Sequence, residues 1–256
     1  LHDALPISCL FRGIHKGKIE INSEKGLDDY LKILFSNEKF PEWNISKNVI
    51  KERLKKESYP FSFAFVFRKI VEEYAKYKPE AKVFIHKAGR YFTNIGLFRK
   101  IMPDTNHIFI KRDPRAIFNS QKKSIDSVKK KIMSENIGKF CANFKKRMKI
   151  VEDIKHKDFF YLLEYENLIK NENNEMEKLL NYLEVSHEKE DHNEHYFEKI
   201  PEGQKHLHSN LSKHNLESRI NAWQQELKKS EIFFIQKVLL HELQINGYTV
   251  LNIEKL

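Results

Sequence analysis

The amino-acid sequence predicts an α/β fold in which a parallel sheet is flanked by helices. Short runs of β-branched and aromatic residues alternate with longer segments of helical periodicity, which is typical of parallel strands joined by crossover helices. The length of 256 residues suits one large domain, which we place at residues 9–256. A content of 40% hydrophobic and 12% aromatic residues is sufficient for a buried core and excludes a disordered chain.

The first half of the predicted order is mainly helical. Apolar residues recur at helical spacing within residues 27–77, which predicts a helical segment of three helices. Residues 81–86 form the first strand candidate, because this short apolar run is rich in β-formers. Helical spacing returns at residues 91–101 and stops before Pro103.

Two further strands are predicted in the middle of the chain. Residues 106–111 form the second strand candidate, and a turn and a helix from Pro114 follow it directly. A long basic helix or helix pair is expected at residues 125–155. Residues 159–163 then form the third strand candidate.

The last third of the chain is predicted to be helical around one polar loop. Helices are expected at residues 172–185, 216–227 and 230–243, and Gly247 is expected to cap the last of them. Residues 187–212 are rich in His, Glu and Asn, and their histidines lack the spacing of metal ligands. We therefore expect a polar loop there and no metal site.

Composition limits the environment and the partners of the chain. There is no run of eighteen apolar residues, so no membrane span is expected. The two cysteines, Cys9 and Cys141, cannot form a disulfide framework, which favours a reducing, cytoplasmic compartment, with peripheral membrane association left open. The net charge of +10 favours an anionic partner such as a phosphorylated cofactor, a nucleic acid, a sulfated glycan or an acidic membrane face.

The beginning of the sequence resembles a cloning scar. The chain starts with leucine, and residues 1–8 resemble a translated sequencing adapter that should be excluded from fold reasoning. We therefore expect the native start, with any first strand, to be missing.

The sharpest local signal is Arg112-Asp113-Pro114-Arg115, directly after the second strand. Asp113 can cap the following helix and Pro114 suits its first position. Arg112 and Arg115 would then stand beside a helix N-terminus at the carboxyl end of a strand, where phosphate groups bind. Alternatively, Arg112 and Asp113 merely pair with each other, and the local sequence leaves both interpretations open.

The order of these features resembles the sulfotransferase family that uses 3′-phosphoadenosine 5′-phosphosulfate. The resemblance covers residues 82–248 and is carried by Arg112 with Ser120, Tyr165-Glu166-Asn167-Leu168, Leu180-Asn181-Tyr182-Leu183, and Lys213 before Trp223. It implies a three-layer, P-loop-like parallel sheet and a bacterial sulfotransferase-like enzyme. The implied reaction moves a sulfuryl group from the donor to a hydroxyl of a glycan, lipid or small molecule, without metal.

The resemblance also implies roles for residues that would bind the donor. Arg112 and Ser120 would hold its 3′-phosphate, and Tyr165 would contact a phosphate or the adenine. Ser209 and Lys213 are similar to the loop that closes over the phosphosulfate.

Catalytic roles are implied for residues nearer the N-terminus. Lys87 is similar to the family's lysine beside the transferred group, where a fixed cation stabilises developing negative charge. Glu20 is the expected general base, and Glu24 is the alternative.

The family's glycine- and serine-rich phosphosulfate loop is not found in this sequence. Only eight glycines are present, none of them clustered, and Phe11-Arg12-Gly13 is the nearest remnant. Such a loop binds phosphate through successive backbone amides. We therefore expect the chain to be truncated, to lack its first strand and to transfer no sulfuryl group.

Two other functions are considered. A P-loop-type nucleotide kinase would need a Gly-x-x-x-x-Gly-Lys-Ser/Thr loop and a Mg²⁺-binding acid, and neither is visible. A basic nucleic-acid-binding module could use residues 122–155. As a sulfotransferase, the chain is expected to bind the donor, its product adenosine 3′,5′-bisphosphate and a carbohydrate acceptor, but no nucleic acid.

Overall fold

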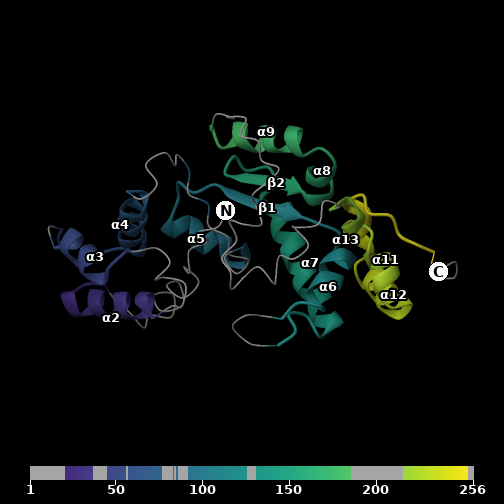
Figure 1. The fold of residues 1–256 in the computed structure, drawn as a ribbon, viewed down its shortest axis with the longest axis horizontal. Helices are drawn as coiled ribbons and strands as arrows, with labels where there is room; N and C mark the ends of the chain where they lie inside the picture. The colour runs from purple at the N-terminus through teal and green to yellow at the C-terminus, as the bar shows by residue number, and fades with distance from the viewer. Residues whose placement is uncertain are drawn as a thin grey trace. The chain divides into compact units, whose positions relative to one another are not determined.

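A computed structural model describes residues 21–36, 45–55, 57–76, 83, 85, 92–125, 131–185 and 216–252 (Figure 1). The chain divides into two compact units, Leu1–Thr105 and Asn106–Leu256. The first is a helical cluster in its described part, and the second contains a parallel sheet.

Three helices dominate the first unit: α2 (Glu24–Phe35), α3 (Lys47–Leu54) and α4 (Phe63–Ala75). Each begins after a serine in extended conformation, and the hydroxyl of this serine accepts a hydrogen bond from a backbone N–H of the first turn. The helix itself leaves this N–H unpaired, so the serine satisfies it. These N-caps are Ser23, Ser46 and Ser62. The three helices lie where the periodicity of residues 27–77 predicts them.

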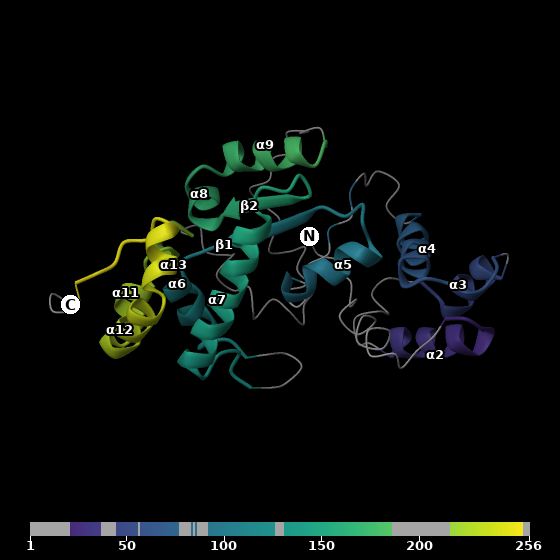
Figure 2. The same cartoon turned by 180° about the vertical axis from the view of Figure 1, so that it is seen from behind.

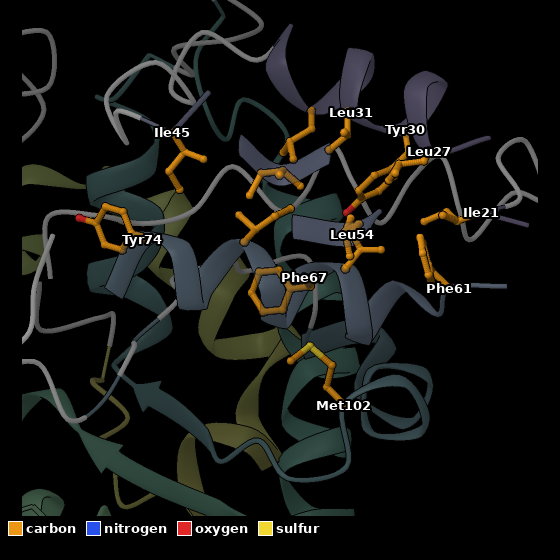
Figure 3. Close-up of a cluster of buried hydrophobic side chains, with 14 of the residues drawn as sticks. Ile21, Leu27, Tyr30, Leu31, Ile45, Leu54, Phe61, Phe67, Tyr74 and Met102 are labelled. Carbon is orange, nitrogen blue, oxygen red and sulfur yellow. The ribbon is translucent and has the colours of Figure 1, made fainter. Parts of the chain in front are cut away.

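The core of this unit lies between these helices (Figure 3). Figure 3 shows Leu31 and Tyr30 of α2 pointing toward the helices that carry Leu54 and Phe67. The short helices η2 (Phe92–Asn94) and α5 (Ile95–Ile101) follow, and Met102 after α5 joins the same core. Helix formation over residues 91–101 is therefore confirmed for residues 92–101.

The second unit is built on two parallel strands, β1 (His107–Lys111) and β2 (Phe160–Glu164). Their register pairs His107 with Phe160 and Lys111 with Glu164. The connection runs through α6 (Pro114–Gln121) and α7 (Ile137–Ile154), because parallel strands require a crossover. Both strands lie within one residue of their predicted positions, and an α/β class with a small parallel sheet is confirmed.

Helices lie on both sides of this strand pair. Figures 1 and 2 show α9 (Glu172–Tyr182) along one side and α7 on the other. The short helix α8 (Tyr165–Lys170) begins directly at the end of β2. The unit ends with η3 (Glu217–Arg219), α11 (Trp223–Glu226), α12 (Lys229–Val238) and α13 (Leu240–Ile245).

Two predicted helices are shorter in the structure. Within residues 125–155, α7 begins only after Asn136, whose side chain accepts the backbone N–H of Lys139 at 2.8 Å, and Ile125 instead forms an isolated bridge with Ile132. Residues 216–227 are divided into η3 and α11, and side chains from this segment contact α6.

The predicted C-terminal cap at Gly247 is confirmed. Gly247 has a φ of +74°, its N–H bonds the carbonyl of Gln244, and the N–H of Tyr248 bonds the carbonyl of Leu243. This pair of bonds is the Schellman arrangement, which places a glycine in the left-handed region and reverses the chain. The residues after Gly247 can therefore turn back toward α6.

Some predictions fall on other parts of the chain. The strand candidate at residues 81–86 lies outside the described residues except for Val83 and Ile85, which are not in a strand. The polar loop at residues 187–212 also lies outside them. Among the helices that the structure describes, none combines the length and apolarity needed to cross a bilayer.

Candidate functional site

The carboxyl ends of β1 and β2 lie side by side and bring Arg112 and Tyr165 together. Lys111 and Glu164 are register partners, so the next residue of each segment emerges at the same edge of the sheet. The guanidinium carbon of Arg112 lies 4.2 Å from the ring centre of Tyr165. This distance allows a cation–π contact, which holds the arginine in one orientation.

Arg112 retains unused hydrogen-bonding capacity in this position. One terminal nitrogen, Nη2, donates to the backbone carbonyl of Arg219 at 3.5 Å, whereas Nε is buried and has no partner among the described residues. A guanidinium carries five N–H donors, and stacking on Tyr165 occupies only its face. Arg112 can therefore bind an anion without giving up the contacts that orient it.

Asp113 caps α6 as predicted, but its side-chain partner is Arg115 and not Arg112. Its Oδ1 accepts the backbone N–H of Arg115 at 2.8 Å, and the two carboxylate oxygens accept Nε and Nη2 of the same arginine at 3.0 and 2.7 Å. The alternative in which Arg112 and Asp113 pair with each other is therefore wrong. The bidentate contact leaves Asp113 fully engaged.

Arg115 is a structural residue, although the sequence placed it in an anion site. Only 2% of it is exposed, and its Nη1 donates to Gln236 Oε1 and to the carbonyl of Thr249, each at 2.8 Å. Its guanidinium also lies 3.9 Å from the ring centre of Trp223. These partners fix the start of α6 to α12 and to the end of the chain, and they leave Arg115 unavailable to a ligand.

Glu166 joins the ends of the two strands. Its Oε1 accepts the backbone N–H of Asp113 at 2.9 Å, and the Tyr248 hydroxyl lies 3.4 Å from Oε2. Burial raises the pKa of Tyr248, and the negative charges of Glu166 and its neighbours raise it further. The phenol thus stays protonated and donates to Glu166.

Ser120 stands in the last turn of α6. It is exposed, and its hydroxyl forms no hydrogen bond with any residue that the structure describes. At a rise of about 1.5 Å per residue it lies roughly 9 Å along the helix from Pro114. The structure therefore leaves this hydroxyl free on the surface, and it shows no contact between Ser120 and Arg112.

The other predicted site residues lie elsewhere in the sequence. Glu24 is exposed in the first turn of α2, in the helical unit. The remaining four lie outside the described residues: Lys87, Glu20, Ser209 and Lys213. No group of three His, Cys, Asp or Glu side chains within the described ranges could hold a metal ion.

Glu226, which no sequence pattern indicated, supports the site from α11. Its carboxylate accepts hydrogen bonds from Asn119 Nδ2, from Lys123 Nζ at 2.8 Å and from Arg219 Nη1 at 2.9 Å. Burial raises its pKa, but these donors and the charge of Arg219 outweigh burial and lower the pKa to about 2. Since the Arg219 carbonyl accepts from Arg112, Glu226 ties this contact of Arg112 to α6.

Comparisons with known proteins agree on one family. A family model described as the sulfotransferase family matches residues 24–189, which is more than half of the chain. The sulfotransferase domain from the curacin biosynthetic pathway has a similar structure, with a TM-score of 0.54, over 98% of this chain and 88% of that chain. The sequence identity is 16%, so this likeness concerns the fold alone. No curated protein matches the chain.

Proposed function

The chain belongs to the sulfotransferase family, and we propose that its reaction is the transfer of a sulfuryl group from 3′-phosphoadenosine 5′-phosphosulfate to a hydroxyl-bearing acceptor. The observation that carries this proposal is Arg112 at the carboxyl end of β1, stacked on Tyr165 with a buried N–H that lacks a described partner. A charged donor group fixed at a strand end suits a phosphate of the nucleotide.

The phosphate would be bound by side chains and not by the first turn of α6. Asp113 already occupies that position through its bond to the backbone N–H of Arg115, and its negative charge would repel a phosphate placed there. Arg112 projects from the same junction and has no such carboxylate partner within the described ranges. Arg112, with Ser120 further along α6, is therefore our candidate for the 3′-phosphate, and Tyr165 for the adjoining phosphate or adenine.

In the transfer step, an acceptor hydroxyl oxygen would attack the sulfur of the donor. The new S–O bond forms as the S–O bond to the donor's 5′-phosphate breaks, and adenosine 3′,5′-bisphosphate leaves. We assign Lys87 to the charge that develops on the bridging oxygen and Glu20 to the acceptor proton. Ser209 and Lys213 would close over the phosphosulfate. These four assignments rest on the family resemblance.

The acceptor is proposed to be a carbohydrate hydroxyl, and nucleic acid is not proposed as a partner. The described helix α7 carries four lysines and one arginine, but its basic residues stand on a helix face opposite an apolar one, as on many solvated helices. Binding of the bisphosphate, and not of a nucleic acid, is therefore the first property to measure.

Calorimetric titration with adenosine 3′,5′-bisphosphate tests the donor site. Each charge-assisted bond to phosphate contributes roughly 1.5–3 kcal/mol, so Arg112→Ala should weaken binding about tenfold or more. Arg112→Lys should recover only part of the affinity, because an ammonium cannot present a planar pair of donors. Arg147→Ala, which removes the same charge from α7, is the matched control and should bind normally.

Unchanged affinity in a folded Arg112→Ala protein would remove Arg112 from the donor site. Equal losses in Arg112→Ala and Arg147→Ala would show that only overall charge matters. A steep salt dependence of binding to random nucleic acid, without binding of the bisphosphate, would favour the nucleic-acid-binding alternative.

A further inference from the structure

A cavity of about 430 Å³ opens at the same end of the sheet. Lys111 at the end of β1 and Asp113 both line this cavity, whereas Arg112, which stands between them in the sequence, does not. Neither Tyr165 nor Ser120 lines it. Figures 1 and 2 show α8, α11 and α13 gathered around this end of the sheet. The volume falls in the range of about 300–1,000 Å³ that is usual for small-molecule sites.

The charged groups that line this cavity largely neutralise one another. Lys111 is paired with Glu164, and Arg115 with Asp113. The charged groups that remain on the wall are Glu166 and Lys170, one of each sign. The wall carries three carboxylates and three basic groups, so its charges cancel. Neither an anionic nor a cationic ligand would therefore meet a net attractive field. The wall therefore favours a neutral ligand.

Amide side chains give the wall both donors and acceptors. The Asn167 amide nitrogen donates to Glu164 at 2.6 Å and that of Asn246 to the Glu242 carbonyl at 2.7 Å, which leaves their amide oxygens as acceptors. The side-chain amides of Asn221 and Gln224 form no hydrogen bond with any described residue, so each offers a donor and an acceptor. A hydroxyl both donates and accepts, and it is the neutral group that best matches such a mixed surface.

Trp223 adds an unsatisfied donor. Its side chain lines the cavity and is 2% exposed, and its indole N–H is buried with no acceptor among the described residues. A buried donor without a partner costs about 1–3 kcal/mol, which an oxygen atom of a ligand would relieve. Together, the aromatic and amide side chains form a neutral surface that combines apolar contact with hydroxyl recognition.

We propose that this cavity is a binding site for a neutral sugar residue, separate from the donor site at Arg112. The ligand class follows from the cancelled charges, the free amide groups and the buried indole N–H. Among the described residues assigned to the donor, neither Arg112, Ser120 nor Tyr165 lines this cavity, so the proposed sugar site and the proposed 3′-phosphate site can be tested separately.

Saturation-transfer NMR on the full chain tests the proposal with three probes: D-glucose, N-acetylglucosamine and maltotriose. The monosaccharides and the trisaccharide distinguish a site for a free sugar from one for a residue within a glycan. We expect at least one probe to bind with millimolar affinity, both with and without saturating adenosine 3′,5′-bisphosphate.

Variants connect the signal to the cavity. The exposed pair Asn221→Ala and Gln224→Ala, made together, should weaken sugar binding at least tenfold. Asn143→Ala, which removes an exposed amide from α7, is the control and should bind as the parent chain does. Melting curves of both variants verify that they are folded.

Three results would overturn the proposal. These are the absence of binding by all three sugars, equal binding by the double variant and the parent chain, and loss of binding in Arg112→Ala. The last result would place the sugar at the donor site. A failed bisphosphate titration would instead count against the proposed function alone.

Discussion

Replacing Glu226 by glutamine tests how the support behind Arg112 is built. In the native protein the carboxylate receives donors from Asn119 and Lys123 of the α6 region and from Arg219 of η3. Glutamine keeps the shape of the side chain but carries no charge and offers only one acceptor oxygen. Arg219 would lose its ion pair, and the Arg219 carbonyl that accepts from Arg112 would be less firmly held.

The size of the effect follows from the pKa of Glu226. Burial raises this pKa, but hydrogen bonds from Lys123, Asn119 and Arg219 lower it from 4.5 to about 2. At about 1.36 kcal/mol per pKa unit, the difference corresponds to at most roughly 3.4 kcal/mol. The side chain is 28% exposed, so solvent screening reduces the expected contribution to about 1–2 kcal/mol. Because the folded pKa lies below the unfolded one, this stabilisation is complete above about pH 4.5 and is lost as the pH falls through about 2.

Urea unfolding of the parent chain and Glu226→Gln between pH 7 and pH 2 measures this contribution. The free energy of unfolding of the variant should be lower by about 1–2 kcal/mol at pH 7, and the gap should close as the pH approaches 2. Glu152→Gln on α7, which breaks an exposed pair with Lys155, is the control and should cost under about 0.5 kcal/mol. A gap that stays constant with pH, or no gap at pH 7, would refute the reasoning.

Three other outcomes follow from the structure. Arg115→Met should lower the free energy of unfolding, measured by chemical denaturation, by about 3–5 kcal/mol, because it leaves Asp113 buried without its partner. A loss below about 1 kcal/mol would contradict the structural role of Arg115. Cys141 should resist alkylation at pH 8 until the chain unfolds, since burial raises the pKa of its thiol to about 11. Rapid alkylation of the Cys141 peptide in the native protein, measured by mass spectrometry, would argue against this. Gly247→Ala should cost about 1 kcal/mol in thermal unfolding, because alanine is strained at a φ of +74°, and an unchanged midpoint would count against the Schellman turn.

The junction between β1 and α6 is predictable from sequence because its determinants are local. An apolar run followed by Asp113 and Pro114 predicts the strand end, the cap and the first helical residue, and all three are found. The start of α7 also has a local determinant, the side chain of Asn136, but the prediction over residues 125–155 rested on helical periodicity and did not use this cap. Boundaries inside long basic segments are therefore the least predictable part of the fold.

The roles of residues within the junction depend on distant partners. Arg112 and Arg115 stand three positions apart and are chemically identical, yet one retains a buried donor without a described partner and the other is fully engaged. The difference is made by Gln236, Thr249 and Trp223, which local sequence cannot place beside Arg115. Glu226 was missed for the same reason, since Asn119 lies 107 residues before it.

The partners of Arg115 also determine when the junction can be completed during translation. Gln236 follows Arg115 by 121 residues and Thr249 by 134, close to the end of the chain. On a nascent chain the Arg115 guanidinium therefore lacks these acceptors until residues 236 and 249 have been synthesised. The helical core of residues 21–102 needs no such late segment and can form while synthesis continues. A truncated mRNA would yield a folded N-terminal unit attached to a second unit in which Arg115 lacks its acceptors. Quality-control proteases degrade such incompletely folded chains.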